Sequence, residues 1–199
     1  MEIAVRIGDW FDAVSASAGH RARADRAAML AEARKLAVDV LYSEKGHFAA
    51  ASAWRRRNYW LGIPAALIGA AAGATILASA DPVVSGILAL AGAAITALMT
   101  FLNPSERAAQ HQRAGVAYAQ LRRKVRQFAQ IDMAGMESAA LRATLTALTE
   151  EVGSTQGEAL AIPSAAYRAA MKSIESGSAD YTDQELDAAT GRVGAQSST

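Results

Sequence analysis

Residues 59–80 read YWLGIPAALIGAAAGATILASA and residues 83–102 read VVSGILALAGAAITALMTFL, with only Asp81 and Pro82 between these two uncharged runs. Each run is about 20 residues long, the length that a helix needs to cross ~30 Å of hydrocarbon. A chain inside lipid must be helical, because lipid gives backbone N–H and C=O groups no hydrogen-bond partner. The runs therefore predict a transmembrane hairpin with spans at 59–80 and 83–102.

A buried hairpin inside a large soluble helical protein is the alternative interpretation of these runs. It is disfavoured because a chain of 199 residues has little other sequence to wrap two helices that are apolar on all sides. We therefore expect an all-α membrane protein with a cytoplasmic helical bundle built from both flanks of the hairpin. The expected divisions are 1–58 for N-terminal cytoplasmic helices, 59–102 for the hairpin, 103–177 for C-terminal cytoplasmic helices and 178–199 for a polar, partly disordered tail.

The composition of the chain limits its chemistry. Twenty Lys and Arg residues against 19 Asp and Glu residues give a net charge of +1, so there is no electrostatic reason to expect direct nucleic-acid binding. The absence of cysteine excludes disulfides, thiolate metal sites and cysteine nucleophiles. A cleavable signal peptide is not expected, because Asp9 and Asp12 interrupt the early sequence and the first apolar run begins far from the N-terminus.

Basic residues flank the two runs, whereas the turn between them carries only Asp81. The positive-inside rule then predicts that both termini are cytoplasmic and that the turn faces outward. Trp54, Tyr59 and Trp60 lie at the inner edge, where amphipathic rings favour the headgroup region. We interpret the basic residues as membrane anchors in contact with lipid, in preference to a specific ligand site. The membrane-proximal set is Arg55, Arg56, Arg57 and Arg107.

Small residues are frequent in both spans. Gly69 and Gly73 form a GxxxG pair in the first span, a spacing that lets helix backbones approach closely in lipid. A stripe with spacings of three and four in the second span either packs the hairpin or lines a watery path in an oligomer, and hairpin packing is somewhat favoured. Neither span contains an acidic, basic or histidine side chain, which argues against a proton relay or an ion-coupled carrier. The stripe consists of Ser85, Ala89, Gly92, Thr96 and Thr100.

The polar flanks are predicted to be helical. Residues 1–19 suggest a short amphipathic helix, either on the membrane surface or as a lid on the bundle. Residues 22–57 suggest a longer helix that runs into the first span, with Gly46 as a weak point. After the second span, Asn103, Pro104 and Glu106 have the pattern of an N-cap, N1 and N3.

The segment after residue 104 has the most regular periodicity in the chain. Apolar and aromatic residues recur there at alternating spacings of three and four, which is a heptad seam. We expect this cytoplasmic seam to pack on the 22–57 helix of the same chain, with pairing between subunits as the alternative. Further helices are expected around 141–152, from Ser164 to Gly177, and briefly after Thr182, with disorder over 191–199. The seam residues are His111, Tyr118, Leu121, Val125 and Phe128, together with Ala114.

No catalytic constellation is apparent. The sequence has no GxxxxGK[ST] loop, no HExxH and no G-x-S-x-G elbow. The histidines are scattered, and we interpret His111 as a packed, hydrogen-bonded side chain instead of a ligand or a base. We expect no enzymatic activity, no cofactor and no metal site.

Four motifs, in this order and spacing, resemble the SLATT family, the two-span effector domain associated with bacterial nucleotidyltransferases and SLOG-type sensors. The resemblance extends from about residue 22 to residue 181. The motifs are WRRRNYW at 54–60, FLNPSERAAQH at 101–111, IPSAAY at 162–167 and IESGSADY at 174–181.

The resemblance implies a role in bacterial conflict and anti-phage systems. It implies an inner-membrane effector that oligomerises and forms a pore or disrupts the membrane. The trigger would be a nucleotidyltransferase-linked or SLOG-linked partner, or a cyclic-nucleotide signal. The alternative is a membrane-tethered scaffold that binds or restrains a soluble partner without forming a pore.

Overall fold

A computed structural model of the chain describes residues 2–79 and 81–190, with side chains from residue 19 onward. Every regular element in these ranges is helical, which confirms the all-α class. The elements, in chain order, are α1 (Glu2–Leu77), α2 (Pro82–Leu102), α3 (Pro104–Gln130), the short 3₁₀ helix η1 (Asp132–Ala134), α4 (Ser138–Glu158), α5 (Ser164–Glu175) and α6 (Asp183–Ala189).

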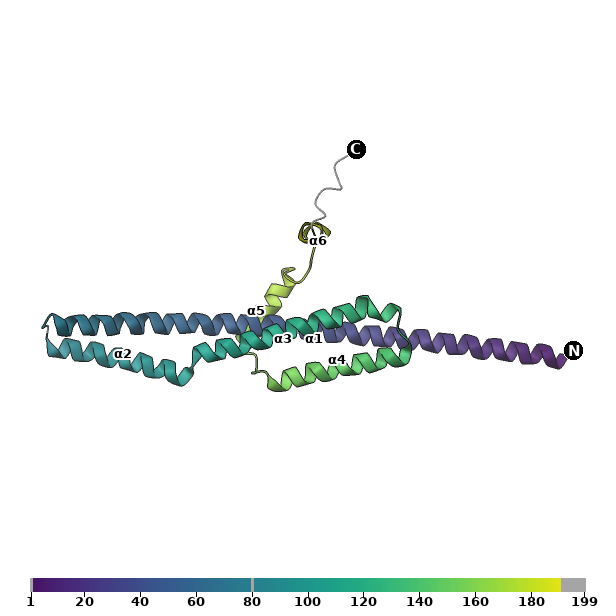
Figure 1. Ribbon diagram of the computed structural model, residues 1–199, viewed down its shortest axis with the longest axis horizontal. Helices are drawn as coiled ribbons and strands as arrows, with labels where there is room; N and C mark the ends of the chain where they lie inside the picture. The colour runs from purple at the N-terminus through teal and green to yellow at the C-terminus, as the bar shows by residue number, and fades with distance from the viewer. Residues whose placement is uncertain (1, 80, 191–199) are drawn as a thin grey trace, which may run out of the picture.

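Helix α1 is a single rod of 76 residues, about 110 Å long at 1.5 Å per residue. It runs the full length of the molecule, from the N-terminal end to the tip of the hairpin (Figure 1). The expectation of a separate helix over residues 1–19 is wrong, because the helical backbone continues from Glu2 into the rest of α1. The predicted weak point at Gly46 is also wrong, because the rod passes through it unbroken.

The apolar hairpin consists of the last quarter of α1 and the antiparallel α2 (Figure 1). Ser79 takes a left-handed φ of 52° in the turn, and the Asp81 carboxylate accepts a hydrogen bond of 2.8 Å from the Val83 N–H. This bond caps α2, and Pro82 occupies the first helical position, where a missing N–H costs nothing.

Both helices of the hairpin are long and apolar enough to cross a membrane. Only 6% and 11% of their most apolar stretches are buried, unlike the core helices of a soluble protein. Large apolar side chains point outward, including Leu67, Leu90 and Phe101, which are 65%, 73% and 85% exposed. The expectation of two long apolar helices is therefore confirmed.

A single residue, Asn103, joins α2 to α3. It has a left-handed φ of 42°, and its N–H donates to the carbonyl of Met99. Asn103 therefore ends α2 and begins α3 at the same position. The helix start that we expected at Pro104 is present, but the expected side-chain cap is wrong, because the Asn103 side chain makes no capping bond.

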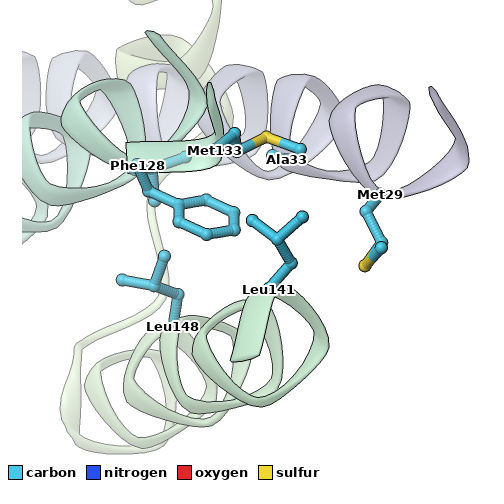
Figure 2. Packing of buried hydrophobic residues seen from close by; sticks show 7 residues of the cluster. Met29, Ala33, Phe128, Met133, Leu141 and Leu148 are labelled. Carbon is cyan, nitrogen blue, oxygen red and sulfur yellow. The ribbon is translucent and has the colours of Figure 1, made fainter. Parts of the chain in front are cut away.

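The polar half of the molecule consists of α3, α4 and α5 packed on α1 between Arg26 and the apolar hairpin. Helix α3 returns along α1, and α4 packs against both (Figure 1). Figure 2 shows the Phe128 ring of α3 directed toward Leu141 and Leu148 of α4, with Met133 and Ala33 nearby. This cluster continues the seam of α3 to its far end.

Arg26 holds the connection between α3 and α4 against α1. Its guanidinium donates to the carbonyl oxygens of Met133, at 2.6 Å, and Met136. These bonds satisfy backbone acceptors that the short helix η1 leaves free. The turn at the far end of α3 is therefore fixed to the rod.

Helix α5 packs on α1 at the glycine that we had interpreted as a weak point. A Cβ added at Gly46 would lie 3.0 Å from Ile162 Cδ1, so the missing side chain makes room for the segment before α5. The rings of Tyr42 and Tyr167 lie 6.0 Å apart between the same two helices. Gly46 is thus a packing position.

Helix α6 begins after Thr182, where the sequence predicted a short helix, and a reciprocal capping box joins Thr182 and Glu185. It projects away from the long axis of the molecule (Figure 1). The expectation of disorder over 191–199 falls outside the described residues.

A glycine on α3 provides a test of this packing. A Cβ added at Gly115 would lie 2.9 Å from two ring atoms of Phe48 on α1. We predict that Gly115→Leu lowers the free energy of unfolding by about 1–3 kcal/mol through overpacking. Thermal unfolding followed by circular dichroism measures the change, at about 2–4 °C for each kcal/mol.

The matched control is Gly153→Leu in α4, where a Cβ meets nothing within 4 Å. This variant keeps or slightly raises the melting temperature, because leucine has a higher helix propensity than glycine. Equal melting temperatures for the two variants would contradict the described packing of α3 on α1.

Candidate functional site

The contact between α1 and α2 follows a heptad spacing on both helices. Its closest point is Gly92, where an added Cβ would lie 3.7 Å from the backbone N of Gly69 and 3.5 Å from Ile68 Cγ2. The glycine therefore lets the two backbones approach each other. Gly62, which is half-buried, faces Met99 beside the heptad positions. The buried and half-buried residues at the heptad positions of this contact are Leu61, Ala65, Ile68, Ala72 and Thr75 of α1, and Ser85, Leu88, Gly92, Ile95 and Met99 of α2.

Two of the five stripe residues lie in this hairpin contact. Ser85 and Gly92 are buried, whereas Ala89, Thr96 and Thr100 are exposed. The hydroxyls of the two threonines donate to the carbonyls of Gly92 and Thr96, four residues earlier, at 2.9 Å and 3.0 Å. The exposed threonines thus satisfy their own polar groups, as a helix in lipid requires.

Gly69 and Gly73 lie at the edge of the hairpin contact: the Gly69 backbone faces Gly92, whereas the side-chain positions of both glycines point away from α2. Both are exposed, and a Cβ added at either would meet nothing within 4 Å. They follow Ile68 and Ala72 of the contact by one residue, which rotates them by about 100° around the helix. The predicted GxxxG pair is therefore available to a neighbour other than α2.

One side of the hairpin gathers exposed glycines and threonines, with alanines, from both helices. On α2, Ala89, Thr96 and Thr100 also follow contact residues by one position. A residue that follows a contact residue by one position is rotated from it by about 100° around the helix axis. In an antiparallel pair, this rotation places such residues of both helices on the same side of the pair. We call this side the small-residue face; it consists of Ala66, Gly69, Gly73, Gly86, Ala89, Ala93, Thr96 and Thr100, and Ile76, 64% exposed, ends it near the turn.

The opposite side of the hairpin carries larger side chains between exposed alanines, which include Ala71, Ala74, Ala91 and Ala94. Leu67, Ile87 and Leu98 precede contact residues by one position, and they are 65%, 62% and 45% exposed. The hairpin therefore has one side suited to close helix contact and another suited to lipid chains.

Arginine side chains surround the junction between the hairpin and the polar half. The guanidinium groups of Arg57 and Arg107 lie 4.5 Å and 5.1 Å from the ring centroid of Trp54. Arg107 also donates from Nε to the carbonyl of Leu102, at 3.1 Å. This stack connects the last turn of α2 to α1 across the Asn103 joint.

The other predicted basic residues are exposed at the same level. Arg55, Arg56 and Arg57 are all accessible, and Arg55 Nη2 donates to Gln112 Oε1 at 3.3 Å. The four arginines thus surround both helices where the apolar run begins.

All five predicted seam residues of α3 are buried against α1 or α4. The seam pairs within the chain, as we expected, and Gly115 and Ala108 complete its buried face. Ala114, at the edge of the seam, is only half-buried.

A polar layer interrupts the apolar contact between α1 and α3. His47 and His111 are each 2% exposed, and their Nδ1 atoms lie 3.0 Å apart. The His47 ring also stacks on Tyr118, with centroids 5.4 Å apart. A hydrogen bond between two Nδ1 atoms needs a proton on one and a lone pair on the other, so the two facing nitrogens share one proton.

A buried ion pair lies one turn from the histidines. Arg122 Nε approaches Glu44 Oε2 to 3.0 Å, and Glu44 is only 7% exposed. That oxygen has no aligned hydrogen bond. Replacing Arg122 would leave an uncompensated buried charge, which costs more than the pair itself contributes.

Burial keeps the histidine pair neutral. Desolvation and, secondarily, the charge of His111 lower the pKa of the His47 imidazole from 6.5 to about 4. Burial and, secondarily, the charge of Arg107 also lower the pKa of His111. Burial raises the pKa of the Tyr118 phenol, and a hydrogen bond with Ser43 opposes this shift.

The sequence analysis did not identify His47, Glu44 or Arg122 as part of a site. The spacing from the turn contains the missing signal: His47 lies 33 residues before Ala80, and His111 lies 30 residues after Asp81. When two long helices pack antiparallel from one turn, residues at similar distances on either side of that turn lie opposite each other. Among residues 19–79 and 81–190, no group of three or more His, Asp or Glu side chains is arranged to hold a metal ion.

Comparisons of the chain with protein-family models, curated proteins and solved structures find no match. The candidate sites are therefore the small-residue face, the arginine-lined junction and the polar layer, each defined by its own geometry.

The polar layer generates a pH prediction. The unfolded His47 side chain binds a proton near pH 6.5 and the folded one only near pH 4, so the unfolded state holds more protons between these values. The free energy of unfolding therefore has its full value above about pH 6.5. It falls by on the order of 3 kcal/mol as the pH is lowered toward 4. Chemical unfolding at a series of pH values measures this loss.

The double variant His47→Leu/His111→Leu should lose most of this slope, because it has no buried imidazole to protonate. The control His20→Gln removes an exposed histidine and keeps the wild-type slope. A wild-type slope in the double variant would assign the acid sensitivity to other groups.

Proposed function

We propose that the chain is a two-span membrane protein that acts as an oligomeric effector in the inner membrane of a bacterium. The polar half lies in the cytoplasm with both termini, and the turn at Asp81 faces outward. A signal received by the polar half shifts the hairpins from a closed to an open assembly, which forms a pore or disrupts the membrane.

The observation that carries this proposal is the two-sided hairpin. The small-residue face contains Gly69 and Gly73 of α1 with Ala89, Thr96 and Thr100 of α2. These residues are exposed in the single chain. In lipid, helices associate mainly through such close packing, because burial of apolar surface gains little there. A second copy of the hairpin fits this face, with the bulkier side toward lipid.

The connection to the polar half supports the regulatory part of the proposal. Helix α1 enters the hairpin without a break, and α2 is one residue from α3. A shift of α3 along or around α1 would therefore move α2 directly. A ligand can cause such a shift only by binding one arrangement more tightly than the other.

The resemblance to the SLATT family supplies the biological setting. It suggests a role in bacterial conflict or anti-phage defence, with a nucleotidyltransferase-linked or SLOG-linked partner, or a cyclic nucleotide, as the trigger. The scaffold alternative would need the α3 seam as an open docking surface for a soluble partner. Because this seam is buried within the chain, we favour a role for the polar half in controlling the hairpins.

A pair of adjacent substitutions tests the small-residue face. Gly73→Leu adds bulk to this face, and we predict that it weakens self-association by about tenfold or more, or about 1.4 kcal/mol. Native mass spectrometry of the protein released from nanodiscs at several protein-to-disc ratios measures the oligomer population. Ala74→Leu is the matched control, because Ala74 is exposed on the opposite side.

The same variants test pore formation. Liposomes loaded with a self-quenching dye report release with the wild-type protein, with and without a mixture of cyclic dinucleotides as probe. Gly73→Leu and Thr96→Leu should reduce release, and Ala74→Leu should retain it. Equal oligomer populations in Gly73→Leu and Ala74→Leu would contradict the interface, and absence of release in every condition would favour the scaffold.

A further inference from the structure

A polar groove lies at the junction, on the side of α1 that continues into the small-residue face. It has a volume of about 310 Å³ and separates α1 from the first turns of α3. Ala108 and Ala109 line it, and no acidic side chain is among the lining residues. The polar lining consists of Arg55, Asn58, Tyr59, Ser105 and Gln112.

Hydrogen-bond donors dominate this lining. The Arg55 guanidinium is held across the groove by its bond to Gln112 Oε1, at 3.3 Å, which leaves further N–H groups free. Asn58 and Gln112 add amide N–H₂ groups, and Tyr59 and Ser105 add hydroxyls. A site of this composition favours an anion with several acceptor oxygens.

The acidic residue in the first turn of α3 does not neutralise this groove. Glu106 accepts a hydrogen bond from Gln110, at 3.1 Å, and pairs with Arg113, at 3.6 Å, and it does not line the groove. Arg56 and Arg57 extend the positive charge along the same turn of α1. The guanidinium of Arg55 is thus available to an external anion.

The height of the groove indicates the source of the anion. Tyr59 and Trp60, which begin the apolar run, are 57% and 75% exposed. The hairpin contact begins one turn later, where a Cβ added at Gly62 would lie 3.3 Å from Met99 Cε. The groove is therefore level with the lipid headgroups if the hairpin spans a membrane, so this inference rests on the proposed function.

We propose that the groove is a binding site for the phosphate diester of an acidic phospholipid. The Arg55 fork binds two phosphate oxygens, and the side chains of Asn58 and Ser105 donate to the phosphate or to the headgroup. A zwitterionic choline lipid fits poorly, because its ammonium would lie beside the Arg55 guanidinium in a groove without an acidic side chain. The acyl chains extend along the apolar hairpin.

The test uses the full chain in detergent with dioleoyl phosphatidylglycerol or dioleoyl phosphatidylcholine, and native mass spectrometry counts the lipids retained. The wild type should retain phosphatidylglycerol in preference to phosphatidylcholine. Arg55→Gln and the double variant Asn58→Ala/Ser105→Ala should each weaken this retention about tenfold. Arg56→Gln is the matched control, because it removes the same charge one residue outside the groove.

Equal losses of phosphatidylglycerol retention in Arg55→Gln and Arg56→Gln would overturn the site, because retention would then depend only on the overall positive charge. Equal retention of the two lipids would also overturn it. Displacement of phosphatidylglycerol by millimolar inorganic phosphate would assign the groove to a soluble phosphate compound and overturn the lipid. Flotation with liposomes distinguishes failure of the lipid site from failure of the proposed function. If the chain floats but shows no site-specific lipid retention, only the lipid site is contradicted. If the chain does not float, the proposed membrane function is contradicted as well.

Discussion

The continuity of α1 is the constraint on which the rest of the structure depends. One helix of 76 residues provides the surface on which α2, α3, α4 and α5 all pack. Helices this long are not stabilised by propensity alone, and the partners on successive stretches of α1 supply the missing packing. The same continuity places the apolar hairpin and the polar half on one axis, so neither can tilt against the other along α1.

Close helix contact along this rod depends on glycines that face large side chains. Gly46 faces Ile162, Gly115 faces Phe48, and Gly92 faces the backbone at Gly69. Between these contacts, the His47–His111 pair and the Glu44–Arg122 ion pair place polar groups inside an otherwise apolar seam. Polar pairs of this kind penalise a shifted register, because any shift leaves a buried group without its partner. The seam is therefore both tightly packed and fixed in register.

The sequence allowed the helices, the turn at Asp81 and the burial of the α3 seam to be predicted, because uncharged runs and heptad spacing are local signals. It did not allow the relation between stripes on different helices to be predicted. Gly69 and Gly73 on α1 and Thr96 and Thr100 on α2 belong to one face only through the antiparallel pairing. His47 and Glu44 look like solvent-facing residues of a polar helix until α3 covers them. The helix start at Asn103 and Pro104 was predicted from its pattern, but the left-handed φ of Asn103, which ends one helix and starts the next, was not, because the pattern matches an ordinary N-cap.

The central claim is that α1 continues from the polar half directly across a membrane. The chain contains no cysteine, so single cysteines report without background, and Ser79 in the turn and Ser52 in the polar half are both exposed. The direct measurement is labelling of Ser79→Cys and Ser52→Cys by a membrane-impermeant maleimide, in intact bacterial cells and after lysis. The account predicts that Ser79→Cys is labelled in intact cells and Ser52→Cys only after lysis. Labelling of both positions only after lysis would contradict it, because the hairpin would then lie on one side of the membrane.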